Sequence, residues 1–299
     1  MSIKQAVAPQ SSVRPSLLAR SITLMKPLTW FAPAWAFMCG SIVSGASYWT
    51  VVDIGRTLLG MLLAGPIVCG LSQVINDYCD REVDAINEPQ RLIPAGLVST
   101  RQVFITIATL VLLSMGIALI LGPTVALLTS IGMVLAVVYS ANPVRAKRNG
   151  WIGNAMVAIS YEGLPWLAGH LSFAPLSTNS LILAALFSLG THGIMTINDF
   201  KSIAGDRQVG INTIPALYGP KRAAMMVVLT MALSQVLVLL VLISQQRWWA
   251  IITMSLIVIA QIPLQRTFLQ HPVEDAVKYS ATSSGLFVIG MLIAAIAMR

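Results

Sequence analysis

Residues 76–84 read NDYCDREVD and lie at the end of a long apolar run. The chain holds only 11 acidic residues in 299, and five of these fall between Asp77 and Glu88. On a helix, Asn76, Asp80 and Asp84 follow one another at i, i+4 and i+8 and share one face. Like charges on one face repel each other, so the stretch predicts a helix end that gathers its carboxylates around a cation.

A second stretch echoes the first. The letters INDY at 75–78 recur as INDF at 197–200, and LIPA at 92–95 is echoed by TIPA at 213–216. Asp206 also follows Asp199 by seven residues, about two helical turns. We interpret this as a weak internal repeat, the alternative being a chance similarity of two helix ends. A true repeat predicts two acidic clusters that meet across one metal-bound diphosphate.

The composition predicts an integral membrane protein. Apolar residues make up 56% of the chain and charged residues 10%, and the mean hydropathy is +0.79. Soluble domains are typically about a quarter charged. The three cysteines show no metal-ligand spacing and fit small core residues. The net charge of +8 is read as a topology signal and not as a nucleic-acid footprint.

The apolar stretches predict an all-α bundle of about nine transmembrane helices with a central cavity opening to the cytoplasmic side. Residues 1–25 form a polar cytoplasmic N-terminal segment in this interpretation, and 26–299 form a single transmembrane domain. Each stretch is long enough to cross a bilayer. The predicted spans are 28–48, 55–76, 102–121, 123–141, 151–171, 180–198, 221–243, 248–265 and 281–298.

The basic residues fix an orientation for these spans. With the N-terminus in the cytoplasm, all of the 19 Lys and Arg residues except Arg56, Arg247 and Arg299 fall on the inner side. The first acidic cluster ends the second predicted helix and the second cluster ends the sixth. An even number of crossings separates them, so both clusters are expected to face the cytoplasm.

The residue types in these clusters suit magnesium and a diphosphate. Carboxylates and an Asn amide are hard oxygen ligands, and Mg²⁺ binds through a few carboxylates plus substrate phosphates. Arg and Lys beside such a metal bind a diphosphate and stabilise it as a leaving group. The alternative for each basic residue is a topology anchor. The candidate diphosphate-binding residues are Arg81, Arg91, Arg145, Lys147, Lys201 and Arg207.

With nine spans and two Asp-containing motifs, the chain resembles the UbiA-type membrane prenyltransferases. Shorter motifs are similar to the chlorophyll and bacteriochlorophyll synthases within that superfamily, and YEGLPW at 161–166 favours the bacteriochlorophyll branch. The resemblance covers about residues 25–220 and leaves the last three helices aside. Its motifs are KPLTWF at 26–31, DAINEP at 84–89, RLIPAG at 91–96, NGWIGN at 149–154 and INDFKS at 197–202.

The resemblance implies roles for the acidic residues. Asn76, Asp80 and Asp84 would supply the first metal face, and Asp206 would serve the second. Asp80, Asp84 and Asp206 are the residues expected to be catalytic. Asp77 lies about 100° round the helix from that face, and we expect it to cap the helix or orient the site rather than to bind the metal. Asp199 is a further candidate metal ligand, but Ser202 stands where the family often has an acid, so support of the site is an open alternative for Asp199.

The resemblance also implies a reaction, which is Mg²⁺-dependent transfer of a geranylgeranyl or phytyl group from its diphosphate to the propionate of bacteriochlorophyllide. This would be the last step of pigment synthesis, in an inner or photosynthetic membrane, with other pigment-synthesis enzymes as expected partners. An ionised carboxylate needs no general base. Chlorophyllide, a quinone ring or haem as acceptor remains an alternative, and an ion-coupled transporter is the non-enzyme alternative.

Three further residues are tentative candidates for the tetrapyrrole cavity. Glu162 lies about 11 residues into a predicted span, where a carboxylate is costly, and a structural hydrogen bond is its alternative role. His192 lies two turns before Asp199 and is either a pigment contact or a core histidine. Trp30 lies beside KP at 26–27 and either shapes the rim or marks the membrane interface.

Overall fold

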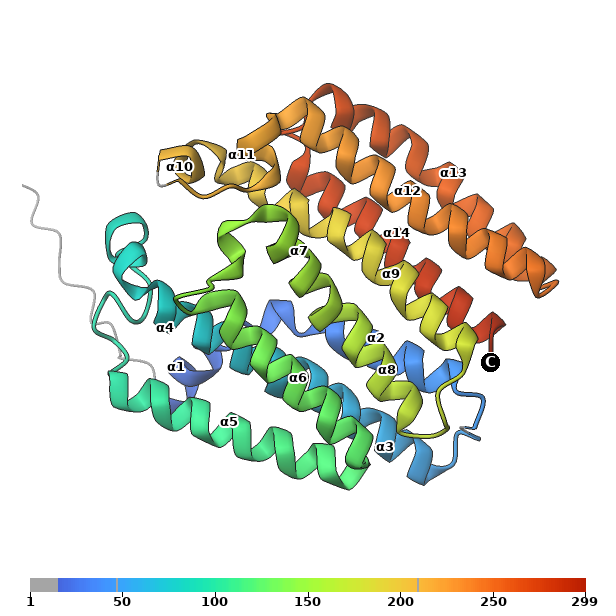
Figure 1. The fold of residues 1–299 in the computed structure, drawn as a ribbon, viewed down its shortest axis with the longest axis horizontal. Helices are drawn as coiled ribbons and strands as arrows, with labels where there is room; N and C mark the ends of the chain where they lie inside the picture. The colour runs from blue at the N-terminus through green and yellow to red at the C-terminus, as the bar shows by residue number, and fades with distance from the viewer. Residues whose placement is uncertain (1–15, 47, 209) are drawn as a thin grey trace, which may run out of the picture.

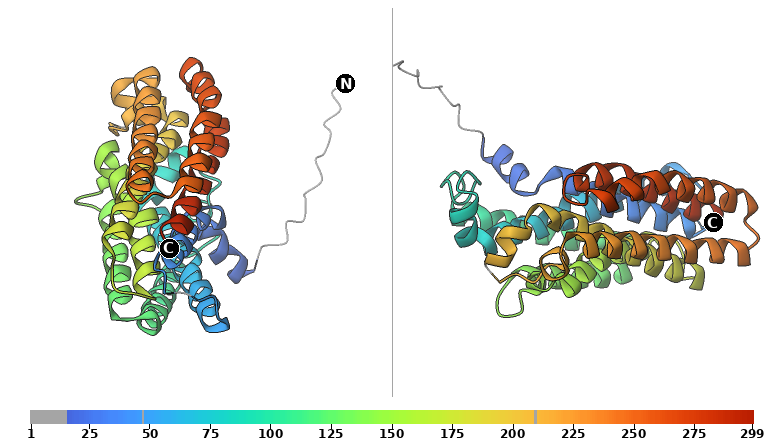
Figure 2. Two further views of the ribbon diagram at one scale, coloured as in Figure 1. Left: turned by 90° about the vertical axis from the view of Figure 1, so that its right-hand side faces the viewer. Right: turned by 90° about the horizontal axis from the view of Figure 1, so that it is seen from above.

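Helices make up nearly all of the structure, a computed structural model that describes residues 16–46, 48–208 and 210–299. The helices run side by side in one bundle, and its long axis is horizontal in Figure 1. Residues 1–15 of the predicted N-terminal segment lie outside the described residues. Helix α1 (Leu17–Leu24) and the 3₁₀ turn η1 (Pro27–Thr29) lead into the bundle, and Figure 2 shows α1 at the same end of the bundle as α10.

The first half of the bundle contains two helices with a π-helical turn inside them. Helix α3 (Val51–Leu62), the π segment η2 (Leu63–Cys69) and α4 (Gly70–Asn87) form one continuous stretch of 37 residues. Helix α7 (Gly150–Ala158), the π segment η4 (Ile159–Gly163) and α8 (Leu164–Leu171) form the other. Between them lie α5 (Thr100–Leu121), α6 (Pro123–Ser140) and the 3₁₀ turn η3 (Ala146–Arg148).

The second half begins with α9 (Thr178–Ile197), which continues into the 3₁₀ turn η5 (Asn198–Lys201). Two short helices follow, α10 (Ile203–Gln208) and α11 (Ile214–Tyr218). Three long helices complete the chain: α12 (Pro220–Ser244), α13 (Trp248–Gln270) and α14 (Ala276–Ala297). Helix α9 packs against α12, and α13 packs against α14.

Seven helical segments of the described chain are long and apolar enough to cross a membrane. The other two predicted spans are helical but differ from the expectation. The range 28–48 contains α2 (Phe31–Val43), which has 13 residues, and 151–171 is divided by η4. A bilayer core takes about 20 helical residues. The 37-residue segment is longer than that, so the NDYCDREVD stretch lies on the turns of α4 beyond its apolar part.

Small residues allow a close helix contact between α2 and α8. A Cβ atom at Gly40 would lie 1.9 Å from the Trp166 carbonyl oxygen, and one at Gly169 would lie 2.0 Å from the Phe37 carbonyl oxygen. Membrane helices approach most closely through such residues. The contact fixes α2 against the α7–α8 helix, and these two elements form part of the wall of the central cavity.

Candidate active site

The carboxylates of α4 meet cations from two other segments. Asp80 accepts a hydrogen bond from Arg145 Nη2 at 2.7 Å and pairs with the Lys147 ammonium. Asp84 is 8% exposed and accepts from Arg91 Nη1 at 2.9 Å. The i, i+4 spacing on α4 therefore places the two carboxylates on one face, and each is neutralised by a cation from a different loop.

The loop between α6 and α7 carries the cations that reach Asp80. Arg145 adopts the left-handed backbone conformation at φ 41°, which turns the chain into η3. Burial lowers the pKa of Lys147, against the opposing effect of Asp80. In the amide orientation that satisfies its neighbours, Asn76 donates to Asp80 Oδ2 at 3.2 Å and accepts from Lys147 Nζ at 3.1 Å. These groups form one charged cluster at the end of the bundle.

Asp77 faces a different partner from the other acids of the stretch. Its Oδ1 atom lies 2.6 Å from Lys26 Nζ and 3.7 Å from Arg91 Nη1. Burial opposes the charge on Arg91, but Asp84 and Glu88 outweigh it and raise the pKa of the guanidinium. Asp77 thus fastens η1 and the loop after α4 to the helix, as its position 100° round the helix predicts.

The second acidic stretch does not repeat the first as a continuous helix. Helix α9 ends at Ile197, and Asp199 lies in the 3₁₀ turn η5, where it lines the same cavity as Asn154. Asp206 lies on α10 and accepts hydrogen bonds from Ser202 at 2.8 Å and Thr213 at 2.9 Å. Asp199 therefore lies at the site itself. Asp206 is held in its orientation by two hydroxyl groups.

A backbone bridge ties the loop after α6, which pairs with Asp80, to the segment that follows Asp206. The Asn212 amide donates to the Arg148 carbonyl at 2.9 Å, and the Gly150 amide donates to the Asn212 carbonyl at 2.8 Å. Tyr139 lies close enough to Asp80 and Asp199 to interact with both charges. The loops that follow α4, α6 and α9 accordingly gather at one end of the bundle, on the left in Figure 1.

A cavity of about 450 Å³ opens beneath this charged end, a size typical of small-molecule sites. Its lining at the charged end is polar and includes Asn76, Ser140, Asn154, Asn198 and Asp199. The two motif regions, distant in the sequence, thus share one cavity.

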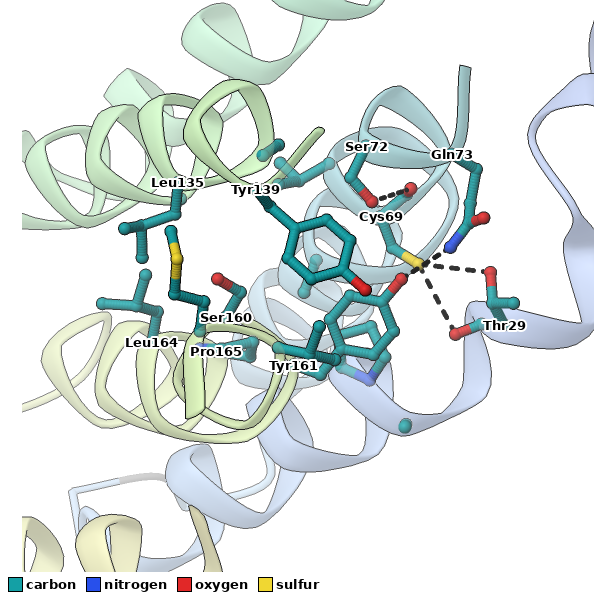
Figure 3. A pocket seen from close by; sticks show the side chains of 18 of the residues that line it. Thr29, Cys69, Ser72, Gln73, Leu135, Tyr139, Ser160, Tyr161, Leu164 and Pro165 are labelled. Atoms are coloured by element: carbon teal, nitrogen blue, oxygen red, sulfur yellow. Dashed lines mark hydrogen bonds between the residues drawn. The ribbon is translucent and has the colours of Figure 1, made fainter. Parts of the chain in front are cut away.

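Further into the bundle the cavity wall is mainly apolar, with Phe37, Leu63, Leu128 and Ala168 among its residues. A small polar group on α4, η1 and η4 interrupts it, and Figure 3 shows these side chains around Tyr161. The cavity therefore suits a ligand with a charged head and a hydrocarbon tail.

The three candidate tetrapyrrole contacts lie outside the lining of this cavity, and their assignment to the tetrapyrrole stays a prediction. Glu162 is 3% exposed and lies near Cys39 on α2, whereas its neighbour Tyr161 lines the cavity. His192 stacks on Trp151 at 5.6 Å and contacts the Trp151 carbonyl. The Trp30 indole donates to the Met25 carbonyl. None of the three is among the described residues that line the cavity.

Three of the expected diphosphate ligands also lie apart from the Asp80 cluster. Arg81 packs over the Tyr78 ring at 4.5 Å and pairs with Glu82 at 3.1 Å. Arg207 donates to the Ala216 carbonyl at 2.9 Å. Lys201 is exposed and close to Asp199. Arg91, Arg145 and Lys147 are the three that the structure brings to the carboxylates of α4.

Sequence reasoning missed the polar residues that line the cavity walls, namely Gln73, Tyr139, Asn154 and Tyr161. Gln73 lies three residues before Asn76, close to the same helical face. That spacing was the available signal for Gln73. Tyr139 lies within an apolar run and carried no such signal, whereas Tyr161 opens the YEGLPW motif at 161–166, which was the signal available for it.

The donor set fits magnesium that arrives with phosphate ligands. Among the residues that the structure describes, no group of three His, Cys, Asp or Glu side chains is placed to hold a metal unaided. Mg²⁺ usually takes one or two carboxylates and completes its shell with water and substrate phosphates. Asn76 and Asp80 are suitable oxygen donors for such a metal. In this structure the Asp80 carboxylate is neutralised by Arg145 and Lys147.

Comparison with known proteins agrees with this geometry. Residues 23–296 match the model of the UbiA prenyltransferase family. The chain is 55% identical to the bacteriochlorophyll synthase 34 kDa chain of Chloroflexus aurantiacus, over 97% of this chain and 93% of that protein. It is 38% identical to the chloroplastic chlorophyll synthase of Avena sativa, over 92% of this chain and 75% of that protein.

A solved structure shares the fold. The UbiA homolog from Archaeoglobus fulgidus bound to DMAPP and Mg²⁺ superposes with a TM-score of 0.70 at 18% identity, covering 93% of this chain and 99% of that chain. At this level of identity the likeness concerns the arrangement of the helices.

Proposed function

The chain belongs to the UbiA prenyltransferase family, and from this premise we propose that it esterifies bacteriochlorophyllide with a polyprenyl group taken from a diphosphate. One observation carries the proposal. A single cavity joins a polar end, lined by Asn76, Asn198 and Asp199 of the two motif regions, to a mainly apolar interior. The cluster of Asp80, Arg145 and Lys147 borders that end through Asn76 and forms the charged mouth with it. A prenyl diphosphate has the matching distribution of charge and hydrocarbon.

The diphosphate is proposed to lie at the charged mouth. Arg145, Lys147 and Arg91 supply charge-assisted hydrogen bonds, which are the strongest that side chains make to phosphate oxygens. These cations now pair with Asp80 and Asp84, so binding exchanges one set of anionic partners for another. The prenyl chain extends along the apolar wall toward Phe37 and Leu128.

We propose Mg²⁺ as the cofactor, held by Asn76, Asp80 and Asp84 with Asp199 and Asp206 on the facing side. The homolog from Archaeoglobus fulgidus was solved with DMAPP and Mg²⁺, which supports a metal of this kind here. When bound, the metal stabilises the negative charge on the departing pyrophosphate. Asp206 keeps its orientation through Ser202 and Thr213.

The reaction is a substitution at the allylic C1 atom. A carboxylate oxygen of the acceptor forms a bond to C1, and the bond from C1 to the diphosphate oxygen breaks. The electron pair of that bond leaves with pyrophosphate, where Arg145 and Lys147 stabilise it. No proton is transferred, because the propionate is already ionised at neutral pH. The residues of the chain therefore orient the substrates and exclude water.

The acceptor assignment follows from similarity to named relatives. The bacteriochlorophyll synthase of Chloroflexus aurantiacus shares 55% identity over nearly the whole chain, against 38% for the chlorophyll synthase of Avena sativa. Bacteriochlorophyllide is therefore preferred over chlorophyllide, with geranylgeranyl or phytyl diphosphate as donor. The protein is a multi-pass membrane protein, and we place its active site on the cytoplasmic face of a photosynthetic inner membrane.

Purified protein incubated with each pair of tetrapyrrole and prenyl diphosphate tests the proposal. The expected result is a prenyl ester of bacteriochlorophyllide, formed with Mg²⁺ and lost when EDTA removes the metal. The product is identified by mass spectrometry after chromatography. Ester formation with chlorophyllide alone, or prenylation of a quinone precursor, would overturn the acceptor assignment. Product formation unchanged by EDTA would overturn the metal assignment.

A further inference from the structure

Two π-helical turns, one on each side, border the cavity. The segment η2 (Leu63–Cys69) lies in the α3–α4 helix and η4 (Ile159–Gly163) in the α7–α8 helix. Such turns are rare and concentrate at functional sites. Between them, Gln73 Nε2 donates a hydrogen bond to Tyr161 Oη at 2.7 Å, as Figure 3 shows. The two turns thus place a polar pair inside a mainly apolar cavity.

This pair has hydrogen-bonding capacity left for a ligand. A glutamine amide carries two N–H donors, and one of those on Gln73 goes to Tyr161. Tyr161 Oη accepts that bond, and its own proton can turn from the neighbouring Cys69 thiol to a ligand in the cavity. The nearby Thr29 hydroxyl is already used, since it donates to the Lys26 carbonyl at 2.9 Å. The pair therefore presents two donors to the cavity, one from each helix.

A prenyl chain cannot satisfy these donors. Polar groups that become buried against hydrocarbon lose their hydrogen bonds to water, and this costs free energy unless a partner replaces the water. Gln73 and Tyr161 both line the cavity, and a hydrocarbon offers them no acceptor. A charged oxygen of the second substrate would be a stronger acceptor for these donors than the neighbouring Cys69 thiol.

The pair lies at the level where the new bond forms. Gln73 precedes Asn76 by three residues on α4, which places it about 4.5 Å deeper along the helix axis. Asn76 belongs to the charged cluster of the mouth, and the reactive C1 atom lies directly below a diphosphate bound there. The attacking atom of the acceptor has to approach C1 to about 3–3.5 Å, so it reaches the same depth as Gln73.

We propose that the Gln73 amide and the Tyr161 hydroxyl form the binding site for the carboxylate of the acceptor, oriented for attack on C1. The inference rests on the proposed function, since it requires an acceptor that reacts through a carboxylate. It assigns the recognition of the nucleophile to two neutral donors. The cations at the mouth remain dedicated to the leaving group.

The test compares the binding of bacteriochlorophyllide with the binding of its propionate methyl ester, followed by tetrapyrrole fluorescence in full-length protein in nanodiscs. One hydrogen bond to a charged group corresponds to a factor of about ten or more in affinity. The wild type, which offers two such bonds, is expected to bind the free acid about a hundredfold more tightly than the ester. Tyr161→Phe and Gln73→Leu each lower this ratio about tenfold and raise the acceptor KM about tenfold.

The donor provides the internal control. The KM for geranylgeranyl diphosphate should stay within about twofold of the wild type in both variants. Tyr279→Phe removes another buried hydroxyl, outside the cavity lining, and should keep the acid preference. If the bond between α4 and η4 is merely structural, its loss weakens the binding of donor and acceptor alike and leaves the acid-to-ester ratio intact.

The outcomes separate the two proposals. An unchanged acid-to-ester ratio in both variants overturns the carboxylate site, even when the wild type makes the ester. Loss of donor binding in both variants also overturns it, because the pair is then structural. A wild type that forms no tetrapyrrole ester overturns the proposed function itself.

Discussion

One turn of α4 separates carboxylates with different surroundings. Asp77 is 8% exposed and pairs with Lys26, which belongs to the segment before α2. Asp80, one turn away on the helix, pairs with Arg145 and Lys147 from the loop after α6. The first pair joins two structural elements, whereas the second gathers charge beside the cavity. The two acids should therefore respond differently to mutation.

Asp80→Asn should lower kcat about 10²–10³-fold, the usual cost of losing one group that stabilises charge at a reacting centre. The variant should remain folded, because Asn keeps the size of the side chain. Ester formation and thermal unfolding are measured on the same preparation. Glu82→Gln is the matched control, since Glu82 is 84% exposed on the same helix and should keep wild-type turnover. Substantial turnover by Asp80→Asn would exclude the carboxylate from the reaction.

Lys147→Met should raise the donor KM at least about tenfold, because removal of one partner from a buried charge pair costs about 2–5 kcal/mol. The Lys147 side chain is 15% exposed and pairs with Asp80. Arg148 follows it in the same turn but is exposed, so Arg148→Gln serves as the control. Steady-state kinetics with varied prenyl diphosphate give both values. Equal KM changes in the two variants would indicate a general electrostatic effect.

Glu162→Gln should leave tetrapyrrole affinity unchanged and keep or raise thermal stability. Glu162 Oε1 has no hydrogen-bond partner among the described residues, and a charge at membrane depth is costly. Glu162→Lys should instead destabilise the protein by about 2.5–3.5 kcal/mol, the cost of a Lys at the centre of a membrane helix. Unfolding midpoints in nanodiscs check both values. A Gln variant as unstable as the Lys variant would show that the carboxylate itself is needed.

At the scale of elements, two backbone hydrogen bonds join the loop after α6 to the segment before α11, and so connect the cations that pair with Asp80 to the surroundings of Asp206. Gly150 lies at its centre, where an added Cβ atom would approach Ile214 N to 2.6 Å and Thr213 Cα to 2.9 Å. Thr213 in turn holds Asp206. A disturbance at Gly150 therefore reaches the Lys147 loop and the second acidic stretch together.

Gly150→Ala should cost about 1–3 kcal/mol of stability through overpacking and lower kcat/KM for the donor. Gly116→Ala provides the control, because a Cβ atom there meets open space on α5 and alanine favours a helix over glycine. Thermal unfolding and donor titration are compared for the two variants. Wild-type donor kinetics in a destabilised Gly150→Ala protein would show that the bridge serves the fold alone.

The sequence predicted those elements whose signals are periodic. The i, i+4, i+8 spacing of Asn76, Asp80 and Asp84 identified one helix face, and the structure confirms that these residues lie on α4. The second stretch was harder to predict, because the same letters IND end an α-helix there and continue as a 3₁₀ turn. Tertiary contacts decide that difference. No local pattern in the sequence specified the Thr213 hydrogen bond to Asp206.

The π turns were also beyond sequence reasoning. The wide turn at Ile159–Gly163 precedes Pro165 and changes the register of the residues around it. Glu162 consequently faces Cys39, and Tyr161 faces the cavity. Adjacent residues on a regular α-helix point about 100° apart, so the register of this helix, set by packing, decides which of the two lines the cavity.

At the scale of the whole molecule, hydropathy predicted the bundle because a membrane imposes one rule on every span. Backbone groups in the bilayer must be satisfied within the helix, so a long apolar run has few alternatives to a helix. The rule specifies neither which helices pack against each other nor how deep each helix lies in the membrane. The short helix α2 and the 37-residue α3–α4 segment show this, since the contacts of α2 with α8 and the polar end of α4 determine their lengths.

The orientation of the bundle in the membrane follows from the uneven distribution of its basic residues and can be measured. The turn between α12 and α13 lies at the end of the bundle opposite the acidic motifs, and the turn between α13 and α14 lies at their end (Figure 1). The positive-inside rule places the motif end in the cytoplasm. In a Cys79→Ser background, an impermeant maleimide applied to intact cells should label Gln245→Cys and leave Glu274→Cys unlabelled until the membrane is permeabilised. Cys39 and Cys69 are buried and should stay unlabelled in the background control. The reverse pattern would place the active site outside the cell membrane, away from a cytoplasmic supply of prenyl diphosphate.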